Sequence, residues 1–305
     1  MNLDMAMTYL DFVAARHQIW EKRQVGEPAP WTNNVVLREK KFTNVFRILD
    51  PGSQFVLTDL VEGDEVEGDL SPRDTLMRLF LYRHTGRIET WRHLEIVGNG
   101  YPFSDHLDET LADWKLYRTS TKKAIFTGAY LVYPQSATPG TDKLESIIDL
   151  TKRLFTEGGP EDIVPKFLVA KTQAARFAAL RNNKGVADFM SMQILTDWGY
   201  STYGEDTEDA FVVAGPGAIK GAAEIDPNKT ALEVIHWAHK ELAQLDIFIQ
   251  LPKWGKRRPS LMDTQNTLCE FSKYVRYMSR PPTGEPYQPA HPGKQPEPIL
   301  PSHWG

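Results

Sequence analysis

Apolar residues recur every three or four positions along most of this chain, and that spacing is the feature that most restricts its fold. Tyr9, Phe12, Val13 and Ile19 show the spacing near the start. Side chains three or four positions apart share one face of an α-helix, whereas a half-buried strand alternates with a period of two. The pattern therefore predicts an all-α or mainly α protein.

Local signals at several positions indicate where helices begin and end. In Ser71-Pro72 the serine can cap a helix and the proline suits its first turn, and Thr230 with Glu233 forms a capping box. Amphipathic stretches predict further helices over about 144–155 and about 261–278. Strand-like composition is confined to short segments that also fit helices.

The length and the proline distribution predict the domain organisation. With 305 residues, of which 41% are hydrophobic, the chain can bury a sizeable core. We expect one helical unit over residues 1–280, built from up to two packed lobes over about 1–155 and 156–280. The segment 281–301 holds eight of the 21 prolines. Residues 281–305 should therefore form an extended tail.

Charge and cysteine content limit the class of protein. The net charge of −5 excludes a globally cationic protein but allows a local basic face that binds nucleic acid. Cys269 is the single cysteine, which excludes an internal disulfide and a cysteine-based zinc site. The sequence has no apolar run long enough to span a membrane, and its start lacks the order of a signal peptide. We expect a soluble cytoplasmic protein with no membrane partner.

A glycine-rich segment is the most specific local motif. In Gly215-Pro216-Gly217 the backbone N–H groups of a tight turn can hold a phosphate, and Lys220 follows as a cation. The segment resembles the hairpin of helix-hairpin-helix DNA-binding proteins, including DNA glycosylases. An ordinary glycine turn is the alternative.

A basic stretch provides a second candidate for contact with nucleic acid. Its four cations, which flank or follow the aromatic ring of Trp254, are Lys253, Lys256, Arg257 and Arg258. Cations suit backbone phosphates and an aromatic ring suits an unpaired base. A solvated basic loop is the alternative interpretation.

The N-terminal part contains the residue types needed to bind a base that carries an anionic group. Trp31-Thr32 supplies an aromatic ring for stacking, Asn44 an amide for the base edge, and Arg16 and Arg47 positive charge. Asn44, Arg47 and Asp50 are spaced for one side of a helical turn. A structural arginine–aspartate brace beside a core tryptophan is the alternative.

The last predicted helix adds acids and bases at helical spacing. Asp263, Glu270, Lys273 and Arg276 are candidates for a site there, although Glu270 and Lys273 also fit a surface ion pair. Cys269 is more easily explained as a core residue than as a nucleophile.

Three widespread catalytic motifs are absent from the sequence. Without a Walker A loop, GxxxxGK[ST], the chain is not expected to form a phosphoryl-donor site of the P-loop type. The absence of HExxH and GxSxG argues against zinc proteases and α/β-hydrolases.

Taken in order, these segments resemble the α-glutamyl/putrescinyl thymine pyrophosphorylase family of phage DNA-hypermodification proteins, which includes the amino acid:DNA transferases. They are also similar to the helical domain of phage 5-hydroxymethyluracil DNA kinases. The resemblance extends to about Arg280. It rests on Phe12 with Arg16, Pro30-Trp31-Thr32, Phe42-Thr43-Asn44-Val45 with Arg47 and Asp50, Arg78-Leu79-Phe80, Glu89-Thr90-Trp91, Phe126-Thr127-Gly128-Ala129-Tyr130, Phe189-Met190-Ser191-Met192-Gln193 with Asp197, Gly215-Pro216-Gly217, and Leu268-Cys269-Glu270-Phe271 with Lys273-Tyr274 and Arg276.

The resemblance implies a helical fold like that of DNA glycosylases and a role in building hypermodified thymine in viral DNA, inside the infected bacterium. In such pathways a kinase first phosphorylates or pyrophosphorylates hydroxymethyluracil in DNA, and a second enzyme displaces that group with an amino acid or polyamine. Because this chain lacks a P-loop, the second role fits it better.

If the chain carries out this second reaction, residues 1–280 form the catalytic and DNA-binding unit, and the chemistry of the reaction predicts roles for individual residues. Arg16 and Arg47 would bind the leaving phosphates, with or without Mg²⁺, and Asp197 or Glu270 would serve as general base. Trp31 would stack on a flipped base, and Asn44 or Gln193 would contact its edge. Three further residues would complete the binding site: Thr32, Lys273 and Arg276.

Two other functions remain open at this point. A DNA glycosylase would release a free modified base. A non-catalytic DNA-binding partner of a hydroxymethyluracil DNA kinase would bind duplex DNA without releasing phosphate.

Overall fold

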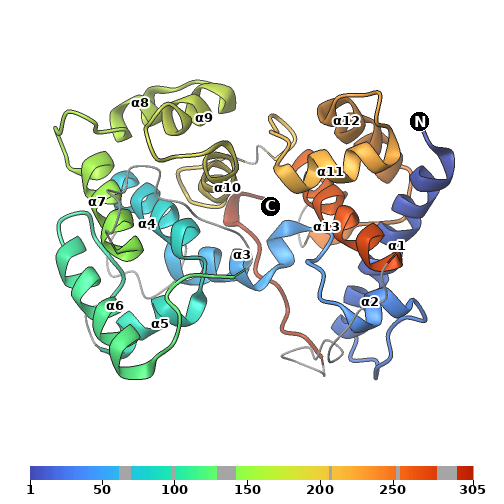
Figure 1. The fold of residues 1–305 in the computed structure, drawn as a ribbon, viewed down its shortest axis with the longest axis horizontal. Helices are drawn as coiled ribbons and strands as arrows, with labels where there is room; N and C mark the ends of the chain where they lie inside the picture. Colours follow the sequence, from blue (N-terminus) through green and yellow to red (C-terminus); the bar gives the residue numbers. More distant parts are fainter. Residues whose placement is uncertain are drawn as a thin grey trace. The chain divides into compact units, whose positions relative to one another are not determined.

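The computed structural model describes residues 1–61, 70–97, 100–128, 142–205, 208–251, 255–279 and 294–304. Within these ranges the protein is mainly helical, which confirms the expected fold class, and its sheet structure consists of two short antiparallel strands. The chain divides into two compact units (Figure 1). Unit 1 comprises Met1–Asp50 and Glu208–Gly305, and unit 2 comprises Pro51–Thr207. The division differs from the one expected near residue 155, because the first helix packs on helices from the last third of the chain.

Unit 1 contains five α-helices, two strands and two 3-10 helices among the described residues. They are α1 (Leu3–Gln24), α2 (Val35–Glu39), η1 (Arg47–Leu49), α11 (Pro216–Ile225), α12 (Ala231–Leu242), β1 (Ile249–Leu251), β2 (Gly255–Arg257), α13 (Leu261–Ser279) and η3 (Ser302–Trp304). In the sheet, Gln250 lies opposite Lys256.

Among the described residues of unit 2, all regular secondary structure is helical. Its elements are α3 (Pro51–Phe55), the π-helix η2 (Val56–Val61), α4 (Pro72–Thr85), α5 (Ile88–Ile96), α6 (Leu107–Thr121), α7 (Lys143–Phe155), α8 (Val164–Val169), α9 (Gln173–Arg181) and α10 (Asp188–Trp198). Its core includes the fully buried rings of Trp91 and Trp114, whose centroids lie 5.7 Å apart.

Helix boundaries follow the local sequence signals. The Ser71 hydroxyl accepts a hydrogen bond from the Asp74 N–H at the start of α4, and Gly86 ends that helix with a φ of 65°. Thr230 and Glu233 form the expected capping box at the start of α12. The predicted starts of α4 and α12 are therefore confirmed.

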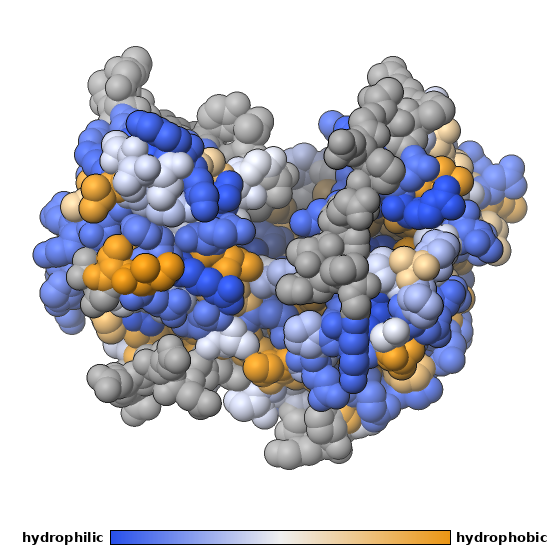
Figure 2. All heavy atoms as spheres, turned by 90° about the horizontal axis from the view of Figure 1, so that it is seen from below, coloured by the Kyte–Doolittle hydropathy of each residue, from blue (hydrophilic) through white to orange (hydrophobic). Residues whose placement is uncertain are grey.

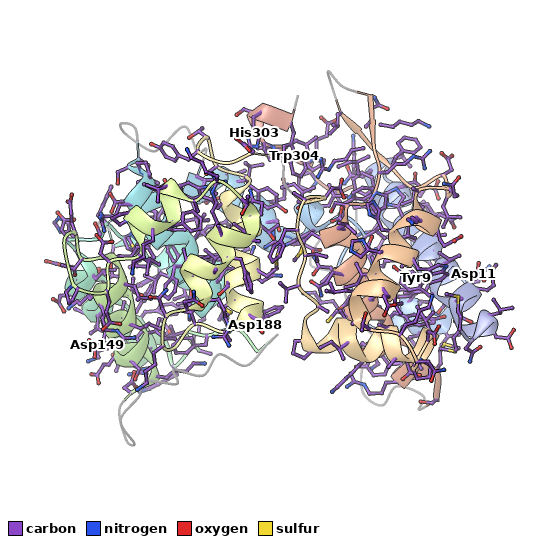
Figure 3. All side chains as sticks on the ribbon, turned by 90° about the horizontal axis from the view of Figure 1, so that it is seen from above. Tyr9, Asp11, Asp149, Asp188, His303 and Trp304 are labelled. Atoms are coloured by element: carbon purple, nitrogen blue, oxygen red, sulfur yellow. The ribbon has the colours of Figure 1, made fainter. Side chains whose placement is uncertain are left out.

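Aromatic side chains join α1 to α13 in the core of unit 1. The Tyr9 hydroxyl and the Thr267 hydroxyl are 2.8 Å apart, and the Tyr9 and Phe271 rings meet edge to face at 5.3 Å. Tyr9 is completely buried, whereas Asp11 on the same helix is exposed (Figure 3). The first helix is thus fixed to the last long one.

Two glycines let α11 approach α13 closely. A Cβ added to Gly217 would overlap the Cys269 thiol, and one added to Gly221 would overlap the Leu268 carbonyl oxygen. Gly215 is the N-cap of α11, and residues 208–214 before it form turns and irregular backbone. The expected helix-hairpin-helix turn is therefore not confirmed, since Gly217 lies in the first turn of a packed helix.

The C-terminal segment returns to unit 1. The Gln295 N–H donates to the Arg23 carbonyl at 3.2 Å, and the Trp304 ring is buried with the Arg257 guanidinium 3.7 Å from its centroid. Residues 294–301 have no regular secondary structure, whereas Ser302–Trp304 form η3, and the extended tail over 281–305 stays a prediction. The part of that tail over 281–293 lies outside the described residues.

The described surface shown in Figure 2 is mainly hydrophilic, with hydrophobic side chains in separate small groups. In the described part of the chain, every helix is too short or too polar to cross a bilayer.

Candidate active site

Arg16 organises the segment after α2. Its side chain is only 9% exposed and projects from the middle of α1. Its Nε donates to the Thr43 carbonyl at 2.9 Å, and one terminal nitrogen donates to the Phe42 carbonyl at 3.2 Å and to Asn44 Oδ1 at 2.8 Å. A buried cation therefore fixes three consecutive residues of an irregular segment.

Asn44 and Asp50 close this segment into a compact loop. The Asn44 amide donates to the Leu49 carbonyl, and the Asn44 backbone N–H donates to Asp50 Oδ1, both at 2.8 Å. Burial raises the pKa of Asp50 to about 6, although the Asn44 N–H and the positive charge of Arg16 and Arg47 act in the opposite direction. The carboxyl of Asp50 can therefore exchange a proton near neutral pH.

Arg47 connects the loop to the start of α13. It lies in η1 with 4% exposure, and its backbone N–H donates to Asp263 Oδ1 at 2.7 Å. Ser260 donates its backbone N–H to the other oxygen of that carboxyl at 3.0 Å. Burial, reinforced by the nearby charge of Glu208, raises the pKa of Asp263 to about 7. Glu208 itself is paired with Arg257 at 2.9 Å.

Glu270 and Lys273 border the loop on its more exposed side. Glu270 Oε2 accepts hydrogen bonds from the Thr43 N–H at 3.0 Å and from Lys273 Nζ at 2.7 Å. The same ammonium group lies 4.5 Å from the centroid of the Phe42 ring. We call the following set the arginine network: Arg16, Asn44, Arg47, Asp50, Asp263 and Glu270.

The other residues predicted for this part of the site lie in unit 1 but make local contacts. The Trp31 ring donates to the Glu27 carbonyl at 2.8 Å and lies under the Arg23 guanidinium at 5.0 Å. Thr32 accepts a hydrogen bond from the Asn34 N–H, and Arg276 lies over the Tyr277 ring at 5.2 Å. Their substrate-binding roles stay predictions.

Gln193 and Asp197 lie on α10, in unit 2. Asp197 is completely buried, and the Arg83 guanidinium holds both of its oxygens, with one terminal nitrogen 2.7 Å from Oδ1. Gln193 is 7% exposed on the same helix. The structure thus assigns Asp197 a bidentate ion-pair partner, and the role of general base stays a prediction for it.

The basic stretch that was expected to grip phosphates is partly folded into unit 1. Arg257 lies in β2 and pairs with Glu208, and Arg258 donates to the Leu245 carbonyl at 2.6 Å. Lys256 is 54% exposed and lies 3.7 Å from Asp246. Lys220 is exposed on α11, whereas Lys253 lies outside the described residues. Lys220 and Lys256 are therefore the more accessible cations of this predicted interface.

A separate cavity of about 300 Å³ lies in unit 2 beside α6. Tyr101 and Phe103 supply aromatic surface, and Glu109 and Asp113 supply carboxylates on one face of α6. The sequence motifs did not point to this cavity, and it contains none of the predicted site residues.

The arginine network brings together two buried arginines, an amide and several carboxyls within unit 1. Such a set can stabilise a departing anion and exchange a proton at a neighbouring group. In the described ranges, no three His, Cys, Asp or Glu side chains are grouped to hold a metal ion, so the expected participation of Mg²⁺ stays a prediction.

Fold and site together define a helical protein of two units with a buried arginine–carboxyl network. The chain belongs to the family of the helical domain of 5-hmdU DNA kinases, whose model matches residues 4–283. It is 26% identical to the 5-hmdU DNA kinase of Bacillus phage SP10 over 306 aligned residues, which cover 88% of this chain and 44% of that protein. The chain therefore spans less than half of that relative's length. No solved structure matches it.

Proposed function

We propose that the chain is a transferase acting on DNA that carries a phosphorylated hydroxymethyluracil. It displaces the phosphate or pyrophosphate on the base with an amino acid or a polyamine. Membership of the hydroxymethyluracil DNA kinase helical-domain family supports the DNA substrate. One observation carries the proposal: two buried arginines and a readily protonated carboxyl, Asp50, meet around the loop of residues 42–50.

The reaction needs positive charge more than a nucleophilic side chain. The bond between the exocyclic carbon at C5 and the phosphate oxygen breaks, and that oxygen leaves with the bonding electrons. The nitrogen of the incoming amine forms the new bond to the same carbon and loses a proton to a carboxylate. Arginines suit the departing group because they bind phosphate oxygens in a bidentate way.

Arg16 and Arg47 are the proposed phosphate-binding residues, and Asn44 contacts the base edge. The base must leave the DNA stack to reach them, at a cost of a few kcal/mol. Asp50 is the favoured proton acceptor because its pKa of about 6 lies near the working pH. Glu270 is engaged by Lys273 and Asp197 by Arg83, so both are less suited to this step.

Arg47→Ala tests the proposal. We expect the turnover number for phosphorylated hydroxymethyluracil DNA and a pool of amines to fall by about 100-fold or more, as when one group that stabilises the transition state is removed. Mass spectrometry of the nucleosides measures the product. Arg38→Ala is the matched control, because Arg38 is exposed on α2 in the same unit. Wild-type turnover of Arg47→Ala with unchanged affinity would remove Arg47 from the mechanism.

Asp50→Asn tests the proton acceptor. The wild-type rate should rise with pH through about 6, as the carboxyl ionises, and this rise should be absent in Asp50→Asn. A variant that keeps the wild-type pH profile would exclude Asp50 from this role. Free modified base and abasic sites, instead of an aminated nucleoside, would identify a glycosylase.

A second candidate is a DNA-presenting partner of a hydroxymethyluracil DNA kinase. It is favoured by one observation, namely that the hydrogen bonds described for Arg16 all go to residues 42–44, as they would in a structural brace. Such a protein binds duplex DNA, stimulates an added kinase and forms no aminated product with any amine in the pool.

A further inference from the structure

Charge is distributed unevenly along the chain, and one segment of unit 2 is purely basic. Residues 163–187 contain five Lys or Arg and no Asp or Glu. The rest of the chain contains 30 Lys and Arg against 40 Asp and Glu. A positive region on an acidic protein indicates a site for a polyanionic partner.

This segment forms two short helices that lie side by side (Figure 1). α8 and α9 are joined by residues 170–172, and Thr172 caps α9 by accepting a hydrogen bond from the Ala175 N–H at 3.1 Å. Of the nine residues of α9, only Leu180 is buried. Ala174, Ala175 and Arg181 are exposed, and the other five residues of α9 are partly exposed.

The cations of this segment are available to a partner. Lys166, Lys171 and Lys184 are exposed, and the side chain of Arg176 is half-buried. Among the described residues none of these four side chains forms an ion pair, and Arg176 Nε lacks a hydrogen-bond partner. The fifth cation, Arg181, is paired with Asp188.

The exposed face of α9 is also shaped for close approach. Lys171 lies just before α9. The exposed Ala174 and Ala175 and the partly exposed Ala178 follow it at helical spacing, so the side chains next to this cation are small. A nucleic-acid backbone can approach such a face closely, and the positive end of the helix dipole lies next to Lys171. The Gln173 side-chain oxygen, one turn before Arg176, is buried without a hydrogen-bond partner in the described structure.

Contacts with the rest of unit 2 hold α9 and the segment after it in place. The Arg153 guanidinium of α7 donates to the Lys184 carbonyl at 2.9 Å, and Leu180 anchors α9 in the core. A fixed array of cations loses less conformational freedom on binding than cations on a loop.

We propose that α8, α9 and their flanking residues 170–172 and 182–184, here called the basic surface, bind the phosphate backbone of DNA. The proposal rests on the proposed function in one respect, namely that the substrate is DNA. It adds a contact region in unit 2 to the predicted cations Lys220 and Lys256 of unit 1. The contact proposed is with backbone phosphates, which carry no sequence information directly.

The test neutralises the four available cations and leaves the helices intact. Its variant is K166Q/K171Q/R176Q/K184Q, and its binding to a fluorescent, unmodified 20-bp duplex is measured across a salt series. Log K falls as log salt rises, and each phosphate contact makes this slope more negative by about 0.9. We therefore expect the slope of the variant to be less negative by about 3 to 4. Its affinity at low salt should fall by at least about tenfold.

The matched control is K122Q/K123Q/K229Q/K240Q, which removes the same charge from exposed lysines on other elements. It should keep the wild-type slope. Ala175→Glu, which adds a negative charge on the exposed face of α9, should weaken binding, whereas Ala112→Glu on the exposed face of α6 should not. Far-ultraviolet circular dichroism confirms that each variant is folded.

Three results would overturn the proposal. One is wild-type binding by the neutralised variant, and another is an equal loss in the control variant, which would reflect net charge alone. The third is loss of binding to phosphatidylglycerol vesicles with DNA binding unchanged, which would indicate a membrane surface. Because the duplex is unmodified, these outcomes are independent of whether the wild type forms an aminated product.

Discussion

The two units bury arginine and carboxyl side chains in different ways. In unit 2, Arg83 and Asp197 form a bidentate pair in which both carboxylate oxygens are held by one guanidinium. In unit 1, the carboxyls of Asp50 and Asp263 instead accept hydrogen bonds from backbone N–H groups. Asp50 and Asp263 are therefore stabilised without a hydrogen-bonded cation on each, unlike Glu208 of the same unit, which pairs with Arg257.

This difference separates a carboxylate paired with a guanidinium from carboxyls that have a raised pKa. A buried carboxylate with its own guanidinium stays ionised, whereas a buried carboxyl with a weaker counter-charge is easily protonated. The raised pKa values of Asp50 and Asp263 belong to the second kind. The same residue types thus form a bidentate ion pair at Arg83 and Asp197, and carboxyls with a raised pKa at Asp50 and Asp263.

Breaking the Arg83–Asp197 pair of unit 2 should have the largest effect on the free energy of unfolding. Asp197→Ala leaves a largely buried guanidinium without its carboxylate, and we expect the free energy of unfolding to fall by about 3–5 kcal/mol. Chemical denaturation measures it. The double variant Arg83→Met/Asp197→Leu should recover much of this loss. If the single variant is as stable as wild type but inactive in transfer, Asp197 is a catalytic residue instead of a brace.

Weakening the arginine network of unit 1 should lower the free energy of unfolding by a smaller amount. Arg16→Lys keeps the charge but loses the fork that reaches the Phe42 carbonyl and Asn44. We expect a loss of about 1–3 kcal/mol in the free energy of unfolding. Arg38→Lys on exposed α2 is the control and should be neutral. An equal, small effect in both variants would show that the loop of residues 42–50 does not depend on Arg16.

The pH dependence of stability reports on the Asp50 carboxyl of unit 1. Folding raises the pKa of Asp50 from its ordinary value of 3.8 to about 6, so the folded state binds more protons than the unfolded state between these values. The stability of wild type relative to Asp50→Asn should therefore fall as the pH rises from about 4 to about 6. Thermal melts across this range measure it.

Using the variant as reference removes the contribution of His17. Burial lowers the pKa of this histidine to about 4, which makes the protein more stable as the pH rises from about 4 to 6.5. A difference between wild type and Asp50→Asn that stays constant with pH would contradict the raised pKa of Asp50.

The smallest effect is expected for an ion pair on the surface. Arg181 and Asp188 are both about half exposed, so water screens their attraction. Asp188→Asn, at the exposed start of α10 (Figure 3), should change the free energy of unfolding by less than about 1 kcal/mol. A larger loss would indicate that this pair holds α9 on unit 2.

Local features of the structure were predictable from the sequence, and long-range ones were not. The starts of α4 and α12 follow from Ser71 and Thr230, because capping involves only neighbouring residues. The three-residue strands β1 and β2 were not predicted, because they are too short to show an alternating pattern.

The candidate site shows the same limit. Arg16, Asn44 and Arg47 were predicted together, and the structure brings them to one loop. By contrast, no local signal pairs Asp197 with Arg83, which is 114 residues away in the chain. The spacing of Gly217 and Gly221 fits both a turn and a packed helix, so the sequence alone could not decide how these glycines are used.

The close packing of α11 on α13 turns Cys269 into a natural reporter. Its thiol lies directly beneath Gly217, in the space where any larger residue would have its Cβ. Burial raises the pKa of this thiol, so little of it is in the reactive thiolate form. Cys269 is only partly exposed and its thiol lies against α11, so a bulky alkylating reagent should label it slowly. Faster labelling of this sulfur would report that α11 and α13 separate there.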